Sequence, residues 1–343
     1  MHNASSSIDF DQLARWLRPV LNGGALLDVE RCMSGGSNEI FTLRHDDGVW
    51  VLKRPAVNPV DAEASRRIIE REYRVLQALD STPVLHPHTV AFCDDVSVAG
   101  ACFYVMEHLD GWTPDGPFPS PFDADASARQ DFGYAMLDQL AALHCVDWRA
   151  VGLEGFGKPD GFLERQVDRW LAHLERNRTR DIPGIEQVAS WLRENRPSDG
   201  PTAILHGDFQ PHNTIFGRDR PVRMLGIVDW EQATIGDPLL DLGGLLAGWS
   251  DPGEPARFAS YCTPREGLPT RAHLLERYAA ATGFDVSHAA YHEVLASFKL
   301  ACVLEGNFRL YVTGKSDRDV HRRMGDIVLG LARSSEATIN GMA

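Results

Sequence analysis

The sequence predicts an α+β protein in two parts, a β-rich front lobe over residues 1–108 and a helix-rich back lobe over residues 109–343. Two observations support this division. Short apolar runs separated by turn residues dominate the front of the chain, and apolar side chains at helical spacing dominate the rest. A length of 343 residues suits about two domains with a large core.

The front lobe is expected to contain a β-sheet. In residues 27–55, LDVERCMSGGSNEIFTLRHDDGVWVLKRP, a first apolar strand enters a turn of small residues and two further strands flank an Asp-Gly turn. Asp-Gly between β-prone runs predicts a hairpin. Residues 59–79 carry apolar side chains at helical spacing and predict a helix. Residues 101–109, ACFYVMEHL, read as a further strand.

The back lobe begins with a Pro-rich stretch over residues 111–123, which has the composition of a linker or lid rather than of a packed element. The pattern after this stretch is mainly helical. The expected helices cover residues 125–144, 162–177 and 185–195, and the chain from about 270 to its end. Residues 204–216 and 225–237 are expected to form a small β insert among these helices.

Composition excludes several classes of protein. The formal net charge is −14 and the pI is near 5.3, whereas nucleic-acid binding needs a concentrated basic surface, so no nucleic acid is expected as a partner. No apolar run reaches the roughly 18 residues that span a bilayer, and the N-terminus lacks the basic start of a signal peptide, so no membrane partner is expected. The six cysteines form no C-x-x-C pair, which argues against a disulfide framework or a cysteine zinc site. We therefore expect a cytoplasmic enzyme or binding protein.

One stretch concentrates polar side chains between two strand-like pieces. ILHGDFQPHNTIF, residues 204–216, contains His206, Asp208, His212 and Asn213, which by themselves fit a metal site, an acid/base site or a polar turn. Asp229 follows at the end of the next apolar run, and a β-hairpin would bring it close to Asn213. Carboxylate and amide oxygens are the ligands that Mg²⁺ prefers.

The spacing within this stretch matches that of a phosphoryl-transfer loop. In the kinase pattern H-R-D-x-x-x-x-N, the Asp accepts the proton of the attacking hydroxyl and the Asn five positions later holds metal. Asp208 and Asn213 are also five positions apart, and His206 stands two positions before Asp208. Asp229 falls where the second metal-binding carboxylate of a kinase would fall.

The front lobe supplies the groups that would hold a nucleotide. Val51 and Lys53 share one face of their strand, which suits an apolar floor under adenine with an ammonium group beyond it. Glu72 lies at the edge of the apolar face of the following helix and can pair with that ammonium group. The small-residue turn Ser34–Asn38 could bring backbone N–H groups to phosphate.

The combination of LHGDFQPHNTIF with IVDWEQATIGDPLLDL resembles the aminoglycoside phosphotransferase and choline kinase-like superfamily. The nearer likeness is to the branch that includes the phosphotransferase domain fused to acyl-CoA dehydrogenases. Further segments that resemble this branch are SGGSNEIFTL, VLKRP, EREYRVLQAL, FYVMEHLDG, LHCVDW, VGLEGFGKPDGFLERQVDRW and FKLACVLEG. The resemblance extends over roughly residues 25–330.

The resemblance implies a bilobal, protein-kinase-like fold that binds ATP and Mg²⁺ in the cleft between its lobes, with GTP not excluded. Asp208 matches the catalytic base, Asn213 and Asp229 match the Mg²⁺ ligands, and Lys53 matches the phosphate-binding Lys with Glu72 as its partner. The hinge, whose backbone meets adenine in this family, corresponds to Glu107, His108 and Leu109. The loop that covers the phosphates corresponds to Ser34, Gly35, Gly36, Ser37 and Asn38.

Departures from the kinase pattern narrow the expectation. Gly207 replaces the Arg of H-R-D and no A-P-E segment follows, so a protein substrate and activation-loop control are not expected. Gln210 stands where a basic residue would follow the catalytic Asp, so charge neutralisation is expected to depend on Lys53 and the metal. Arg54 adjoins Lys53, and Lys53 is favoured for the phosphate role because it shares the face of Val51.

Other polar residues have plainer interpretations. His206 is expected to hydrogen-bond the loop backbone, and His212 to face solvent unless it touches phosphate or substrate. Asp237 precedes a Pro and is expected to cap a helix, and Asp241 could reach the backbone of the catalytic loop. Arg165 and Arg169 form part of a solvated helix face or meet an anionic acceptor.

These observations together predict a small-molecule kinase that moves the γ-phosphoryl group of ATP to a hydroxyl group. The branch resemblance implies a hydroxy acid or its coenzyme A ester as the acceptor. An aminoglycoside, macrolide or other antibiotic is the alternative within the class, and a catalytically silent nucleotide-binding scaffold is the alternative from another class. Oligomeric state stays open.

Overall fold

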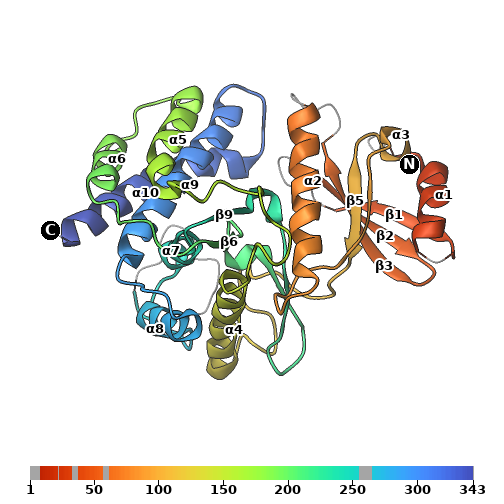
Figure 1. Cartoon of the computed structure of the whole chain (residues 1–343), viewed down its shortest axis with the longest axis horizontal. Coiled ribbons are helices and arrows are strands. Elements are labelled where there is room, and N and C mark those ends of the chain that lie inside the picture. Colours follow the sequence, from red (N-terminus) through yellow and green to blue (C-terminus); the bar gives the residue numbers. More distant parts are fainter. Residues whose placement is uncertain (1–7, 22, 33–37, 57–61, 255–264, 343) are drawn as a thin grey trace. The chain divides into compact units, whose positions relative to one another are not determined.

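The computed structural model of the chain describes residues 8–21, 23–32, 38–56, 62–254 and 265–342. The chain forms two compact units (Figure 1). The first unit contains residues 1–111 together with 151–153 and 225–231, and the second contains 112–150, 154–224 and 232–343. Residues 151–153 and 225–231 lie within the expected back lobe of residues 109–343 but group with the first unit.

The first unit is built on a five-stranded antiparallel sheet with the strand order β1-β2-β3-β5-β4. The β2–β3 pair closes at His45 and Gly48, which confirms the expected Asp-Gly hairpin. The strands are β1 (Leu26–Arg31), β2 (Asn38–His45), β3 (Gly48–Pro55), β4 (Thr89–Cys93) and β5 (Phe103–Glu107). The expected strand over residues 101–109 is therefore β5 with shorter ends.

Three helices pack against this sheet, with α1 and α2 on opposite faces (Figure 1). They are α1 (Phe10–Val20), α2 (Ala62–Leu79) and the short α3 (Val96–Ala99). The carboxylate of Asp9 accepts a hydrogen bond from Gln12 N at 3.0 Å and caps α1. The expected start of the second helix, at residue 59, lies outside the described residues.

Alternation along the strands separates two environments. Leu52 and Val105 belong to an apolar core that also contains Leu13 and Leu17 of α1. Because successive side chains of a strand point to opposite faces, Lys53 on β3 faces α2 instead. One residue of register therefore decides which side chain of β3 meets the helix.

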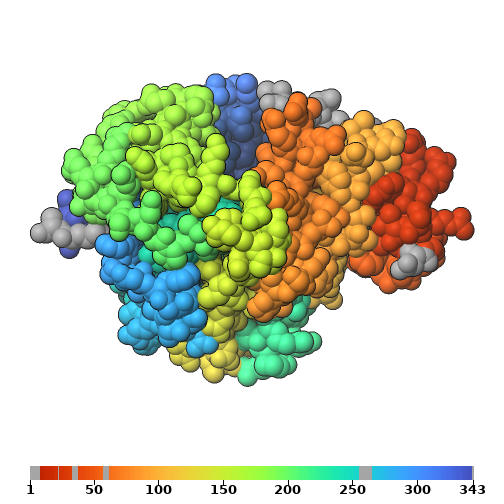
Figure 2. Space-filling model, viewed as in Figure 1, coloured from red at the N-terminus to blue at the C-terminus, as the bar shows by residue number. Residues whose placement is uncertain are grey.

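The second unit is mainly helical. It contains α4 (Ala126–His144), α5 (Phe162–Asn177), α6 (Ile185–Glu194), α7 (Leu239–Gly248), α8 (Arg271–Thr282), α9 (Ala289–Val312) and α10 (Asp319–Met342). Side chains of α5, α6, α9 and α10 form one large apolar core, whereas α8 lies at the surface (Figures 1 and 2). In the part of the chain that the structure describes, no helix is both long and apolar enough to cross a membrane.

Short strands position the polar loop of this unit. β6 (Ala203–Leu205) pairs with β9 (Thr234–Gly236) in an antiparallel register that sets Leu205 opposite Thr234. The polar stretch follows β6 directly and contains the 3-10 turn η1 (Pro211–Asn213) before β7 (Thr214–Phe216). β8 (Met224–Ile227) and the turn η2 (Trp230–Gln232), which were expected in the same insert, belong mainly to the first unit.

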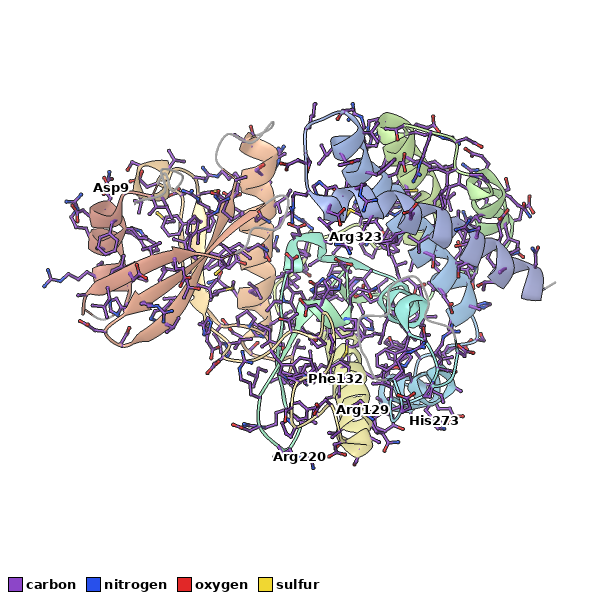
Figure 3. The ribbon with its side chains drawn as sticks, turned by 180° about the vertical axis from the view of Figure 1, so that it is seen from behind. Asp9, Arg129, Phe132, Arg220, His273 and Arg323 are labelled. Atoms are coloured by element: carbon purple, nitrogen blue, oxygen red, sulfur yellow. The ribbon has the colours of Figure 1, made fainter. Side chains whose placement is uncertain are left out.

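The Pro-rich stretch over residues 111–123 is packed, so its interpretation as a linker or lid was wrong. Phe118 and Phe122 are 4% and 2% exposed. Their rings surround Trp112 together with Phe132 of α4, whose position Figure 3 labels, and the Trp112 and Phe132 ring centroids are 6.1 Å apart. The prolines end regular structure without preventing burial, because Trp112, Phe118 and Phe122 anchor the segment.

Candidate active site

A partly buried ion cluster occupies the α2 face of the first unit. The ammonium group of Lys53 donates to Glu72 Oε1 at 2.7 Å and to Asp229 Oδ1 at 2.8 Å. Glu72 Oε1 also accepts a hydrogen bond from the backbone N–H of Trp230 at 2.9 Å. One carboxylate of α2 therefore fixes both the lysine of β3 and the backbone next to Asp229.

The electrostatics of the cluster keep Lys53 charged. Burial by itself lowers the pKa of Lys53, but the nearby carboxylates of Glu72 and Asp229 outweigh burial and hold the pKa well above its usual value. The side chain of Asp229 is 45% exposed, whereas those of Lys53 and Glu72 are buried. Asp229 is therefore the member of the cluster that solvent or a ligand can reach.

Arg54 faces the other side of the sheet. Its guanidinium group donates to Glu39 Oε2 through Nε at 2.9 Å and contacts the carbonyl oxygen of Ala99, and it lies 5.0 Å from the ring centroid of Phe41. Arg54 therefore shares none of the contacts of Lys53. As expected from the alternation of side chains along a strand, the two residues lie on opposite faces of the sheet.

The backbone at Asp229 adopts an unusual conformation. Its φ angle of 66° is the only positive φ among the non-glycine residues that the structure describes. Asp tolerates this left-handed region at a cost of about 1 kcal/mol or more, and such conformations gather at functional sites. In the same unit Asn38 donates to Glu231 Oε2 at 2.7 Å, whereas Ser34–Ser37 of the expected phosphate-covering loop lie outside the described residues.

The second unit contains the residues expected as the catalytic base and as one metal ligand. The side-chain amide of Asn213 donates to the carbonyl oxygen of Asp208 at 2.8 Å and to Asp208 Oδ2 at 3.2 Å. The five-residue spacing thus forms a closed loop in which Asp208 and Asn213 contact each other. Because the amide nitrogen is used within the loop, the amide oxygen of Asn213 is directed away from Asp208.

A buried carboxylate fixes the start of this loop. Asp241 of α7 accepts hydrogen bonds from the backbone N–H groups of His206 at 2.6 Å and Gly207 at 2.9 Å. Burial raises the pKa of Asp241, but the hydrogen bond from His144 and the charges of His206 and Lys299 reverse this effect and lower the pKa. The expected contact of Asp241 with the loop backbone is thus present in the structure.

The residues with plainer interpretations differ in outcome. His206 Nδ1 lies 3.2 Å from the backbone nitrogen of Asp208, so His206 holds the loop backbone. His212 is half-buried rather than fully solvent-facing. The N-cap position of α7 is Pro238 rather than the expected Asp237, although Asp237 Oδ1 still accepts a hydrogen bond from Leu239 N at 2.9 Å.

The replacement of Arg by Gly207 has a steric reason. Gly207 has a φ angle of 83°, in the left-handed region that favours glycine. A Cβ atom at this position would lie 2.4 Å from the carbonyl oxygen of Gln232. No larger residue fits here without movement of the backbone, so the loop lacks the arginine of H-R-D.

Sequence reasoning missed a cation beside the loop. The ammonium group of Lys299 on α9 contacts the carbonyl oxygen of Gly207, one residue before Asp208. Burial lowers the pKa of Lys299, and the charges of Asp208 and Asp241 only partly offset this effect. Lys299 lies 91 positions after Asp208, and the only available signal was the segment FKLACVLEG, which had supported the family resemblance without a role for Lys299.

The remaining predicted nucleotide residues lie around the end of β5. Val51 of β3 pairs with Met106 in the sheet and is half-buried. Glu107 ends β5, and its backbone N–H donates to the carbonyl oxygen of His88 at 2.8 Å. His108 is exposed and Leu109 is half-buried.

The α+β fold with these two polar clusters defines a kinase-like phosphotransferase. A profile of the phosphotransferase enzyme family matches residues 28–292. The acyl-CoA dehydrogenase family member 11 of Gallus gallus is 32% identical over 340 residues, which make up 94% of this chain and 43% of that protein. The chain thus spans less than half the length of this relative.

Solved structures agree with the family profile. A structure from Ralstonia eutropha JMP134, provisionally assigned as an aminoglycoside phosphotransferase, superimposes with a TM-score of 0.79 at 28% identity and covers 96% of this chain and 98% of its own. A thermostable mutant of an aminoglycoside phosphotransferase, solved with ADP and hygromycin B, has a TM-score of 0.61 at 12% identity, with 95% and 98% coverage. The chain belongs to the phosphotransferase enzyme family and is a small-molecule kinase.

Proposed function

We propose that the chain transfers the γ-phosphoryl group of ATP to a hydroxyl group of a small anionic molecule. Asp208 orients the hydroxyl group and accepts its proton, while Lys53, held by Glu72, binds the nucleotide phosphates. The observation that carries the proposal is the contact of the buried Lys53 with both Glu72 and the partly exposed Asp229. Such a cluster is costly to bury and suits the binding of a charged ligand.

The donor groups of the two clusters fit Mg²⁺. Asn213 directs its amide oxygen away from Asp208, and Asp229 offers a partly exposed carboxylate. Oxygen donors of these two kinds are the ligands that Mg²⁺ prefers, and we propose Asn213 and Asp229 as its protein ligands. When bound, Mg²⁺ would neutralise charge on the phosphates.

The protein groups support direct transfer without a covalent intermediate. Asp241 holds the backbone before Asp208, and Asn213 bonds to Asp208 itself, so the base is held in one position. Pre-positioned groups of this kind accelerate phosphoryl transfer mainly by orientation and by charge stabilisation. Lys53 would hold the nucleotide phosphates with a charge that its carboxylate partners secure.

We further propose that the backbone of Glu107, His108 and Leu109 contacts the adenine ring and that Val51 lies beneath it. The turn Ser34–Asn38 would cover the phosphates. The solved relative that binds ADP supports an adenine nucleotide, and GTP is the alternative that a direct comparison would separate.

The groups near Asp208 favour an acceptor with negative charge. Lys299 of α9 lies 5.6 Å from the ring centroid of Trp170, and the guanidinium group of Arg169 lies 4.8 Å from the same centroid. Two cations close to one aromatic ring suit a carboxylate or phosphate attached to an organic body. A cationic aminoglycoside would be repelled by the same pair.

The names of the curated relatives point to the same class. Several of them are named acyl-CoA dehydrogenase family members, and the matched part covers 43% of the chicken protein. A phosphotransferase part joined to an acyl-CoA dehydrogenase would share a hydroxy acid or hydroxyacyl-CoA with it. We therefore propose these compounds as acceptors, with hydroxylated antibiotics as the alternative that several structural neighbours represent.

ATP turnover over a panel of matched acceptors tests this function. Each hydroxylated acid or thioester is paired with its deoxy analogue: 3-hydroxybutyrate with butyrate, and a 3-hydroxyacyl-CoA with its acyl-CoA. Kanamycin is added as the antibiotic acceptor. We expect Mg²⁺-dependent ADP release with a hydroxylated acid or thioester and none with its analogue. Turnover with kanamycin alone would reject the anionic acceptor, and ATP binding without turnover on any acceptor would favour a nucleotide-binding scaffold.

Substitution of the proposed base tests the mechanism. Asp208→Asn should reduce turnover by a factor of about 100 to 10,000 and leave the ATP-induced thermal shift in place, because only proton acceptance and orientation are lost. Asp219→Asn, at an exposed position of the same unit, is the control and should retain full activity. Turnover of Asp208→Asn near that of the wild type would show that Asp208 is not the base.

A further inference from the structure

The connection between α2 and β4 brings two histidines and one aspartate together. Asp80, His86 and His88 each direct one ligand atom toward the others, and these three atoms lie within 4.8 Å of one another. Asp80 Oδ1 is 3.1 Å from His86 Nε2 and 2.7 Å from His88 Nδ1. All three residues belong to the first unit.

The local sequence preorganises this arrangement. In Leu85-His86-Pro87-His88, Pro87 fixes its own φ angle and keeps the preceding residue extended. Side chains two positions apart on extended backbone share one side, and the rings of His86 and His88 have their centroids 5.1 Å apart. Both rings therefore meet the carboxylate of Asp80 from the same segment.

The hydrogen bonds of His86 point to a cation. His86 Nδ1 lies 2.8 Å from the carbonyl oxygen of Val84, which accepts a hydrogen bond and so requires the proton on Nδ1. A neutral imidazole carries only one N–H group, so Nε2 presents its lone pair to the carboxylate of Asp80. Two lone pairs that face each other at 3.1 Å repel unless a second proton or a metal ion lies between them.

A metal ion fits the cluster better than a proton alone. A buried histidine whose second nitrogen is held by a backbone carbonyl is the usual orientation of a metal ligand. His86 is buried, whereas the side chains of His88 and Asp80 are 65% and 41% exposed, so one ligand is fixed and two are accessible to an incoming ion. Two ligands of a tetrahedral Zn²⁺ lie about 3.3 Å apart, which small movements of the exposed side chains would produce.

We propose that Asp80, His86 and His88 form a binding site for a divalent transition-metal ion of the Zn²⁺ type. Two imidazole nitrogens and one carboxylate select such an ion over Mg²⁺, which prefers oxygen donors. The site is separate in ligands and in chemistry from Asn213 and Asp229, and it does not depend on the proposed transfer reaction. Water would complete the coordination.

The backbone of the connection that carries the site makes hydrogen bonds to two other segments of the first unit. The carbonyl oxygen of His88 accepts from Glu107 N at 2.8 Å, and that of Leu85 accepts from Ile227 N at 2.9 Å. The same short connection therefore supports the end of β5 and the strand that leads to Asp229. An ion coordinated by Asp80, His86 and His88 would stabilise both of these hydrogen bonds.

Metal titration with matched variants tests the site. Co²⁺ and Zn²⁺ are titrated into the nucleotide-free chain in excess Mg²⁺, which occupies oxygen-ligand positions. We expect one ion per chain with a nitrogen- and oxygen-ligated cobalt spectrum, and at least tenfold weaker binding by Asp80→Asn and His88→Ala. His273→Ala, at the exposed histidine of α8 that Figure 3 labels, is the control and should bind as the wild type does.

Chemical protection tests the same site in the unaltered protein. Zn²⁺ should protect His88 from modification by diethylpyrocarbonate, as mapped by mass spectrometry, and leave the modification of His273 unchanged. Equal metal affinity of the wild type and both site variants, a thiolate-to-cobalt charge-transfer band, or no protection of His88 would each overturn the proposal. The protection experiment remains informative if a variant folds poorly.

Discussion

The ammonium group of Lys299 contacts the carbonyl oxygen of Gly207, and so a cation of α9 lies beside the loop that carries Asp208. Kinase loops with an Arg in the H-R-D pattern carry a cation within the loop itself, but the left-handed Gly207 excludes a side chain there. A helix far along the chain thus supplies the charge that the loop cannot hold. This arrangement makes Lys299 the first residue to test.

Lys299→Met should reduce turnover by about tenfold or more and leave ATP binding unchanged, because the variant removes positive charge next to Asp208. Burial lowers the pKa of Lys299, so activity that needs its charged form should fall as pH rises through that lowered pKa, before an ordinary lysine with pKa 10.5 would lose its proton. The pH dependence of kcat and the Kd for ATP measure the two effects. The exposed Lys315→Met is the control, and an equal loss of activity in both variants would contradict the prediction.

Glu72→Gln should lower the free energy of unfolding by about 3 kcal/mol, because the buried ammonium group of Lys53 loses its fully buried carboxylate partner. Urea unfolding of the isolated variant measures this change. Glu63→Gln makes the same substitution at an exposed ion pair on the same helix and should cost less than about 0.5 kcal/mol. Similar costs for both variants would mean that Lys53 does not depend on Glu72.

The ion cluster also predicts a pH dependence. A raised pKa for Lys53 means that its contribution to stability is complete below the ordinary value of 10.5 and is lost only as pH rises through the higher folded-state pKa. The stability difference between the wild type and Glu72→Gln should therefore be constant across neutral pH.

Asp241→Asn should destabilise the chain by about 1 to 3 kcal/mol at neutral pH, because the neutral amide accepts weaker hydrogen bonds from the backbone of His206 and Gly207. The pKa of Asp241 is lowered in the folded state, so its contribution is present above the ordinary aspartate value of 3.8 and is lost as pH falls through the folded-state pKa. Unfolding between pH 3 and pH 7 measures the difference, which should narrow only on the acid side of 3.8. Asp168→Asn, at an exposed ion pair with Arg193, should show no such narrowing.

Local patterns predicted the parts of the fold and site that local geometry determines. Strand alternation separated Lys53 from Arg54, and the five-residue spacing brought Asp208 and Asn213 into contact. The contact of Lys299 with Gly207 could not be predicted in this way, because it depends on the packing of α9 against a loop 92 residues away. The arrangement of Asp80 with the two histidines likewise requires a turn whose shape composition does not determine.

The interpretation of the Pro-rich segment as a linker or lid was wrong for a different reason. The burial of this segment leads to a further prediction. Composition describes backbone preferences, whereas the packing of this segment depends on the burial of Trp112, Phe118 and Phe122 against α4. Phe122→Ala should therefore lower the free energy of unfolding by about 3 to 5 kcal/mol, because it removes a ring that is 2% exposed and leaves a cavity. Phe10→Ala, at a ring that is 42% exposed, should cost less than about 1 kcal/mol by the same urea titration. If Phe122→Ala unfolded at the same urea concentration as the wild type, the segment would be a loosely attached lid after all.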